Sequence, residues 1–245
     1  MKRLLVWLSL SLLLLSAGCA REAPDQASWP LRVAVILPHN DDSYFHDMAE
    51  SASAHARELG IDIKVSWPQL NYNIPQITEL IREATAAQVD AIITQGAEVP
   101  SYQAALEEAA RAGIQVVLVD TDIAGGSDYF YVGTDNVEAG RILGRELVRV
   151  TDGLTFSRVL TPETCPVEHI LAFDLTSDSV GGIRAGLLDG VVAQDQRQMG
   201  IIALDEVLRF AREGHYSGAV HYTDSFFVSA ENLDEALSKA AGNEK

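Results

Sequence analysis

Polar and aromatic side chains gather directly after the short apolar runs of this chain, and their types could do chemistry. Carboxylates and carboxamides exchange hydrogen bonds with hydroxyl groups, and Tyr44 and Phe45 add flat apolar faces beside them. This combination suits a sugar or a similar polyol. The residues are Asn40, Asp41, Asp42, Ser43, Tyr44, Phe45, Gln95, Asp120, Thr121, Asp122, Asp174 and Gln194.

The apolar runs alternate with helical patterns, and this alternation is typical of βαβ units around a parallel sheet. The nearly continuous apolar run at residues 32–37 suits a strand that helices cover on both faces. Ligands of such sheets bind just outside the carboxyl ends of the strands. We therefore expect an α/β fold in which these polar residues converge at one edge of each sheet.

The same patterns predict the individual elements. Strands are expected at 32–37, 61–67, 91–94, 115–120, 129–133, 155–160, 167–174, 190–194 and 222–228. Helices are expected at 44–59, 74–87, 101–112, 137–150, 178–188 and 198–212. Gly60, Gly113 and Gly214 are placed to end helices. The polar stretch 122–127 is expected to link two lobes, and 161–166 to form a loop.

An aspartate after a strand has a second interpretation, because it can cap the following helix instead of contacting a ligand. For Asp42, which stands just before the first expected helix, both roles remain open. The same alternative applies to Asp120 and Asp174.

Several kinds of chemistry are excluded or disfavoured. The formal net charge of −17 excludes nucleic acid as a partner, because binding it draws on clustered Lys and Arg. His39 and His46 lie near acidic residues, but their spacing does not converge on a metal, and we expect no metal and no cofactor. No nucleophile and base pair is visible, so the chain is not expected to be an enzyme.

The N-terminus has the pattern of a secretory signal. Lys2 and Arg3 precede an apolar run that is shorter than the roughly 20 residues needed to span a bilayer. The run ends in Leu15-Ser16-Ala17-Gly18-Cys19, which resembles a bacterial lipobox. We expect a signal peptide at 1–18, lipidation at Cys19 and a tether at 19–30, against the alternative of an ordinary signal with a chance cysteine. Cys165 then has no disulfide partner and is expected to be a free thiol.

An ordered set of segments resembles the class I, sugar-type periplasmic binding proteins, including ribose-binding-like proteins that serve ABC importers. The segments are 33–37, 44–45, 90–93, 117–120, 132–136, 172–174 and 192–194. The resemblance implies two Rossmann-like lobes, three crossings between them and a ligand in the cleft. It also implies ligand contacts for Asp42, Tyr44, Phe45, Gln95, Asp120, Asp174 and Gln194.

The chain departs from that family at two places. Thr121 stands where such proteins often have an arginine, and the segment 151–166 is too short for the βα units that the family has there. The second lobe is therefore expected to be shortened: a natural minimal form, an internal deletion, or a lobe that a partner completes. We expect 31–123 with 195–219 as the N-terminal lobe, 124–194 with 220–236 as the C-terminal lobe, and a tail at 237–245.

Together these features predict a lipid-anchored solute-binding protein in the periplasm or cell envelope. Its expected partners are a sugar, an ABC permease of the inner membrane and, through Cys19, the membrane itself. The alternatives are a sensory module that presents its ligand state to a membrane receptor, and a remnant that no longer binds ligand.

Overall fold

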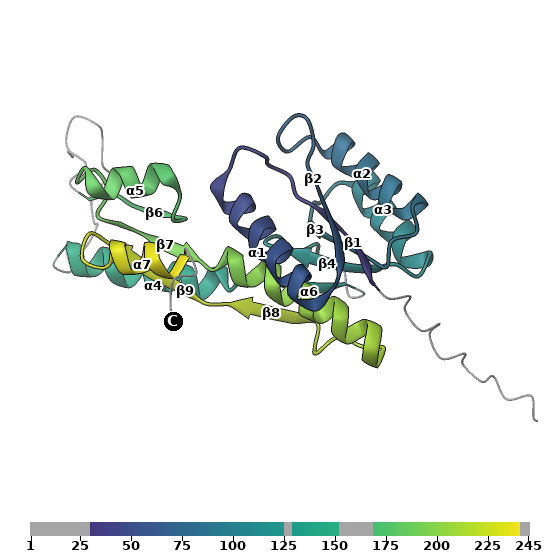
Figure 1. The fold of residues 1–245 in the computed structure, drawn as a ribbon. Helices are drawn as coiled ribbons and strands as arrows, with labels where there is room; N and C mark the ends of the chain where they lie inside the picture. The colour runs from purple at the N-terminus through teal and green to yellow at the C-terminus, as the bar shows by residue number, and fades with distance from the viewer. Residues whose placement is uncertain (1–29, 125–128, 152–168, 241–245) are drawn as a thin grey trace, which may run out of the picture.

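The computed structural model describes residues 30–124, 129–151 and 169–240, which form two α/β lobes (Figure 1). The first lobe is built on a six-stranded parallel sheet of order β2-β1-β3-β4-β5-β8, and the second on a three-stranded sheet of order β6-β7-β9. The α/β class and the two-lobed arrangement agree with the sequence-based prediction.

The strands are β1 Arg32–Ile36, β2 Asp62–Ser66, β3 Ala91–Gln95, β4 Gln115–Val119, β5 Phe130–Thr134, β6 Leu171–Phe173, β7 Gly190–Gln194, β8 Val220–Thr223 and β9 Ser225–Ser229. The helices are α1 Ser43–Leu59, α2 Ile74–Ala86, α3 Pro100–Arg111, α4 Asn136–Val150, α5 Ser177–Arg184, α6 Gln196–Glu213 and α7 Leu233–Ala240.

Helices cover both faces of the first sheet, and the alternating side chains of its strands explain why. Val33 and Val35 of β1 pack in one core with α1 and α6, whereas Ala34 and Ile36 pack in another with α2 and α3. A strand buried on both faces must be apolar at nearly every position. This requirement accounts for the continuous apolar runs in the sequence.

The ends of α1 show how the sequence fixes the start of the site. The Asp42 side chain accepts a hydrogen bond from the backbone N–H of Tyr44 at 2.9 Å, which caps the helix. Gly60 ends it in the left-handed conformation, with φ of 69°, and its N–H bonds to the carbonyl of Ala56. Both ends agree with the prediction, and the first residues of α1 are held at the carboxyl end of β1.

Two strands lie in a different sheet from the one expected. The expected boundaries after residues 123 and 219 assigned β5 and β8, respectively, to the C-terminal lobe, but β5 pairs with β4, and β8 pairs with β5, in the first sheet. The chain leaves the first lobe only at the start of α4, which packs against the second sheet. Apolar patterns identify a strand but do not specify the sheet in which it pairs, so both boundaries were wrong for these two strands.

The C-terminal segment also differs from the prediction. The single expected strand at 222–228 is divided at Asp224 into β8 in the first sheet and β9 in the second. Strand β9 is antiparallel to β7, because β7 runs toward the first lobe and β9 runs away from it. Residues 237–240 of the expected tail belong to α7.

Other expectations concern residues outside the described ranges. They are the signal peptide at 1–18, Cys19, the tether as far as residue 29, the strand at 155–160, the loop at 161–166, and Cys165. Strand β6 is shorter than the expected 167–174 and begins at Leu171. Within the described ranges, none of the helices has the length and apolar character needed to span a membrane.

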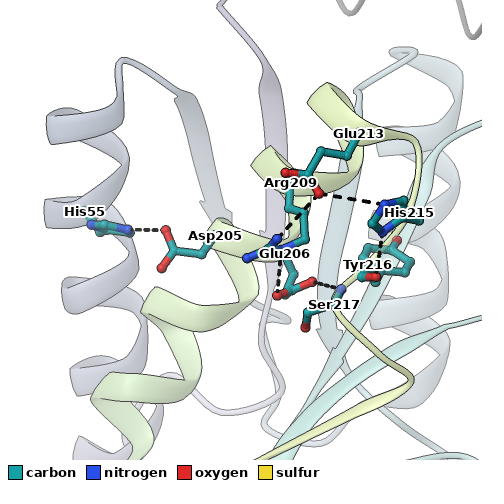
Figure 2. A network of polar contacts seen from close by, with 8 residues as sticks. All are labelled: His55, Asp205, Glu206, Arg209, Glu213, His215, Tyr216 and Ser217. Atoms are coloured by element: carbon teal, nitrogen blue, oxygen red, sulfur yellow. Dashed lines mark hydrogen bonds and ion pairs between the residues drawn. The ribbon is translucent and has the colours of Figure 1, made fainter.

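A polar network joins helix α6 to its surroundings (Figure 2). The buried carboxylate of Glu206 accepts a hydrogen bond from the backbone N–H of Ser217 at 2.7 Å and lies 3.4 Å from Nε of Arg209. On the opposite side, Asp205 lies 2.7 Å from Nε2 of His55 on α1. The network anchors the loop after α6 and links α6 to α1.

Candidate functional site

The candidate site lies where the strands of both sheets end. In the first lobe, Asp120 follows β4 and Gln95 is the last residue of β3. In the second lobe, Asp174 follows β6 and Gln194 is the last residue of β7. The side chains from adjacent strand ends are in contact in each lobe, as the position of binding sites in parallel sheets predicts.

Asp120 is the centre of the first-lobe cluster. Its Oδ1 accepts a hydrogen bond from the Tyr44 hydroxyl at 2.8 Å, and its Oδ2 accepts from Gln95 Nε2 at 2.5 Å and from Thr121 Oγ1 at 3.0 Å. Its backbone carbonyl accepts from the Tyr131 hydroxyl at 2.7 Å. Three side chains therefore fix the orientation of this carboxylate.

The second lobe repeats the aspartate and glutamine pairing. Gln194 Nε2 donates to Asp174 Oδ1 at 2.6 Å. The backbone N–H groups of both aspartates bond to the neighbouring strand at the same distance, Asp120 to Val132 and Asp174 to Val192 at 2.9 Å each. The backbone of both aspartates has the left-handed conformation, with φ of 64° at Asp120 and 72° at Asp174. This conformation is energetically unfavourable for a residue other than glycine.

The carboxylates of the two lobes interact electrostatically. Burial raises the pKa of Asp174 above its usual value, the hydrogen bond from Gln194 opposes this shift, and the negative charges of Asp120 and Asp42 add to it. The acidic groups of the first lobe are therefore close enough to Asp174 for their charges to influence it. Asp42 combines this electrostatic role with the capping of α1.

The expected aromatic faces are not exposed. Tyr44 retains 7% and Phe45 3% of its accessible surface, and both belong to the core beneath the site. Burial and the neighbouring Asp120 raise the pKa of Tyr44, so its hydroxyl stays protonated and donates to that carboxylate. The expectation that these rings offer open stacking surfaces is wrong, because both side chains pack in the core between the first sheet, α1 and α6.

Sequence reasoning missed Tyr72, which belongs to the loop after β2. The residue is 52% exposed, and its ring meets that of Phe45 edge-on, with ring centroids 6.4 Å apart. The rule that selected the other candidates, the carboxyl end of a parallel strand, applies equally to β2. Extending it to the turn at 68–73 would have found this residue.

A cavity adjoins the second-lobe part of the cluster. A cavity of about 510 Å³ lies beside it, where Gln194 and the start of α6 face helix α1, and it does not include Asp120 or Asp174. Within the described ranges, no group of three or more His, Cys, Asp or Glu side chains could hold a metal ion. The polar groups of the site donate and accept hydrogen bonds among themselves, and hydroxyl groups of a ligand could take part in the same chemistry.

Comparisons with known proteins agree with this architecture. Residues 33–153 match the family described as periplasmic binding protein domain. A D-apiose import binding protein of Paraburkholderia graminis is 30% identical over 118 residues, which are 48% of this chain and 37% of that relative. The chain thus matches less than two thirds of the relative's length.

Solved structures share the fold over most of the chain. A glucose-galactose binding protein from Geobacillus stearothermophilus, GanP, has a TM-score of 0.73 at 21% identity, covering 83% of this chain and 98% of its own. A carbohydrate transporter solute binding protein from Agrobacterium radiobacter, in complex with D-arabinose, has a TM-score of 0.73 at 14% identity, covering 86% and 98%. The TM-scores show a common fold, and at these levels of identity the likeness extends to the fold alone.

Proposed function

We propose that this chain, whose residues 33–153 match the family described as periplasmic binding protein domain, captures a sugar or similar polyol between its lobes for ABC import. The observation that carries the proposal is the repeated aspartate and glutamine pair, Asp120 with Gln95 in one lobe and Asp174 with Gln194 in the other. Families of this type bind solutes and do not catalyse reactions, and we assign no catalytic step.

The acceptor capacity of the two aspartates supports a ligand rich in hydroxyl groups. An ionised carboxylate offers about four lone-pair sites. Three donors already occupy three of these sites on Asp120, whereas Asp174 accepts from Gln194 alone among the described side chains. A ligand hydroxyl thus finds more free acceptor capacity on Asp174, and Asp120 is the more rigid of the two.

The chemistry of these contacts favours an uncharged ligand. In the described part of the chain, the side chains that bond to the two carboxylates are tyrosine, glutamine and threonine, with no arginine or lysine among them. Thr121 occupies the place where an arginine was expected from the family resemblance. Carboxylate acceptors without a cationic partner disfavour an acidic solute and suit neutral hydroxyls.

The connections between the lobes suit a hinge. The chain passes between the sheets at the start of α4, at the start of α6 and at Asp224. Short connections of this kind can absorb the backbone rotation when two lobes close around a ligand. Closure would bring the acceptors of both lobes onto one solute.

We further propose that the mature protein is anchored in the envelope through lipid on Cys19, as the lipobox pattern supports. Several acyl chains hold a protein at a membrane far more firmly than one does. Replacing Cys19 by Ala should abolish the incorporation of labelled fatty acid and leave uncleaved precursor. Continued labelling of the variant would contradict the anchor without affecting the binding proposal.

The binding proposal is tested on protein lacking residues 1–19, by thermal shift and calorimetry against D-apiose, D-arabinose, D-galactose, D-glucose and other small polyols. A ligand at about 100 times its Kd should add about 2.7 kcal/mol to the free energy of unfolding. Acidic sugars provide the control and should bind less well than their neutral counterparts. If no polyol raises the melting temperature at millimolar concentration, the solute-binding function fails.

A further inference from the structure

We propose that Tyr72 is a ligand contact of the interlobe cleft and supplies the aromatic face against which the sugar rests. The inference rests on the proposed function and extends it, because Tyr44 and Phe45, the aromatic residues first expected in that role, are buried.

Packing holds the Tyr72 ring at the mouth of the site. Its ring meets Phe45 at an interplanar angle of 74° and His39 at 67°, with centroid distances of 6.4 Å and 5.3 Å. Its backbone N–H bonds to the carbonyl of Pro38 at 2.7 Å, which ties the loop after β2 to the loop after β1. Tyr72 is 52% exposed, so these contacts leave about half of the residue accessible to a ligand.

The backbone of Tyr72 gives an independent indication of function. In the described ranges, four residues other than glycine have positive φ, and three of them are Tyr72, Asp120 and Asp174. The fourth, Gln88, lies after α2 at the opposite end of the sheet. Left-handed conformations are disfavoured for residues with bulky side chains and cluster at binding sites, where surrounding contacts hold them.

The hydroxyl of Tyr72 is suited to donate to a ligand. It makes no hydrogen bond to any described residue, in contrast to the Tyr44 hydroxyl, which Asp120 engages. Partial burial and the charges of Asp42, Asp120 and Asp174 raise the pKa of Tyr72, so the group remains protonated at neutral pH. A sugar placed on the ring would thus meet a free donor beside the acceptors of the two aspartates.

The test measures the affinity for the sugar that gives the largest thermal shift among D-apiose, D-arabinose, D-galactose and D-glucose. Tyr72→Ala should raise its Kd at least tenfold, and Tyr72→Phe, which keeps the ring, should raise it less. Leu70→Ala is the matched control, since Leu70 belongs to the same loop and is 65% exposed. Its Kd should equal that of the unaltered protein.

Nitration of the unaltered protein by tetranitromethane gives a second measurement that needs no variant. The bound sugar should slow the modification of Tyr72, quantified on its peptide by mass spectrometry, whereas a sugar without thermal shift should not. A Tyr72→Ala protein that binds as tightly as the unaltered one, or a nitration rate that the sugar leaves unchanged, overturns the inference and leaves the proposed function standing. If the unaltered protein binds none of the sugars, both fail together.

Discussion

At the scale of single residues, the carboxylates of Asp120 and Asp174 differ in the number of side chains that donate hydrogen bonds to them. Asp120 has three side-chain donors, whereas Asp174 has one donor and an unfavourable environment created by burial and by neighbouring negative charge. Asp174, with more unused acceptor sites, is therefore the better acceptor for a ligand and the costlier group to keep ionised. This difference makes the stability of the protein depend on pH in a defined direction.

Asp174→Asn should stabilise the protein at neutral pH. The pKa of Asp174 in the folded state is raised above its ordinary value of 3.8, so this group ionises at lower pH in the unfolded chain than in the folded protein. The free energy of unfolding therefore decreases as the pH rises from the unfolded pKa to the folded pKa, and the substitution removes this loss. Asparagine keeps the acceptor for Gln194 and tolerates positive φ. Urea denaturation should show a gain that is absent at pH 3 and constant at pH 7.

Asp189→Asn is the matched control with the opposite sign. A hydrogen bond from His169 lowers the pKa of Asp189, which also accepts from the backbone N–H of Ile170 at 2.7 Å. Its ionised form thus stabilises the fold at pH values above its ordinary pKa, and the variant should lose stability at neutral pH. If both variants shift in the same direction, the electrostatic explanation of Asp174 is wrong.

Asp120→Ala should weaken sugar binding by about five- to 150-fold. Removing a hydrogen-bonded carboxylate leaves its partners unsatisfied and typically costs about 1–3 kcal/mol. Asp120→Asn, which keeps the shape and one acceptor oxygen, should lose less. Calorimetry gives both values, and the melting temperatures of the free variants show how much of the loss arises from the displaced Tyr44 and Gln95 side chains.

At the scale of secondary-structure elements, the close approach of α1 and α6 positions the first-lobe half of the site. A Cβ atom at Gly200 would lie 2.5 Å from the carbonyl oxygen of Met48 and 3.0 Å from Oγ of Ser51. That serine also donates to the carbonyl of Arg197 at 2.9 Å, so the two helices share a hydrogen bond at this point. Glycine is required here because backbone atoms oppose it.

Gly200→Ala should therefore destabilise the protein by roughly 1–3 kcal/mol, the usual cost of overpacking a tight contact. Gly181→Ala is the control, because a Cβ at this exposed position of α5 would meet no atom within 4 Å. It should gain roughly 0.5–1 kcal/mol from the better helix propensity of alanine. Denaturant titrations of the two variants should thus move in opposite directions.

The network of Figure 2 gives a second test of α6. Glu206→Ala removes a buried carboxylate, 5% exposed, and leaves the N–H of Ser217 without its partner, so it should cost about 1–3 kcal/mol. Asp205→Ala breaks the contact with His55. The Asp205 side chain is 52% exposed, so its loss should cost less than about 1 kcal/mol. If the two variants lose the same free energy of unfolding in urea denaturation, burial of Glu206 does not account for its contribution.

The elements of the first lobe could be predicted from sequence, and their sheet partners could not. Continuous apolar strands and glycine caps such as Gly60 and Gly214 are local signals, and the structure confirms them. The pairing of β5 and β8, and the division of the last strand at Asp224, depend on long-range contacts that a local pattern does not contain. The carboxyl ends of the strands were correctly identified, but the direction of Tyr44 and Phe45 follows from how α1 packs.

At the scale of the whole molecule, the two lobes differ in how well their sheets are covered. Helices α1 and α6 bury one face of the first sheet, and α2 and α3 bury the other. The second sheet has three strands in the described ranges, with its core on the side of α5 and α7, and the α4 helix beside it buries Ala139 alone. We therefore expect the first lobe to be the more stable of the two.

Hydrogen exchange of the free protein should reveal this asymmetry. Regions with few buried apolar contacts open locally at a lower free energy than a sheet covered on both faces, so their backbone amides exchange faster. Strands β6 and β7 should therefore exchange faster than β1 and β4, although all four lie in sheets. A sugar that binds between the lobes should slow exchange at the carboxyl ends of β4 and β7 more than at the buried middle of β1. Equal protection of both sheets without ligand would contradict the prediction, and would indicate that a partner or a second copy completes the smaller sheet.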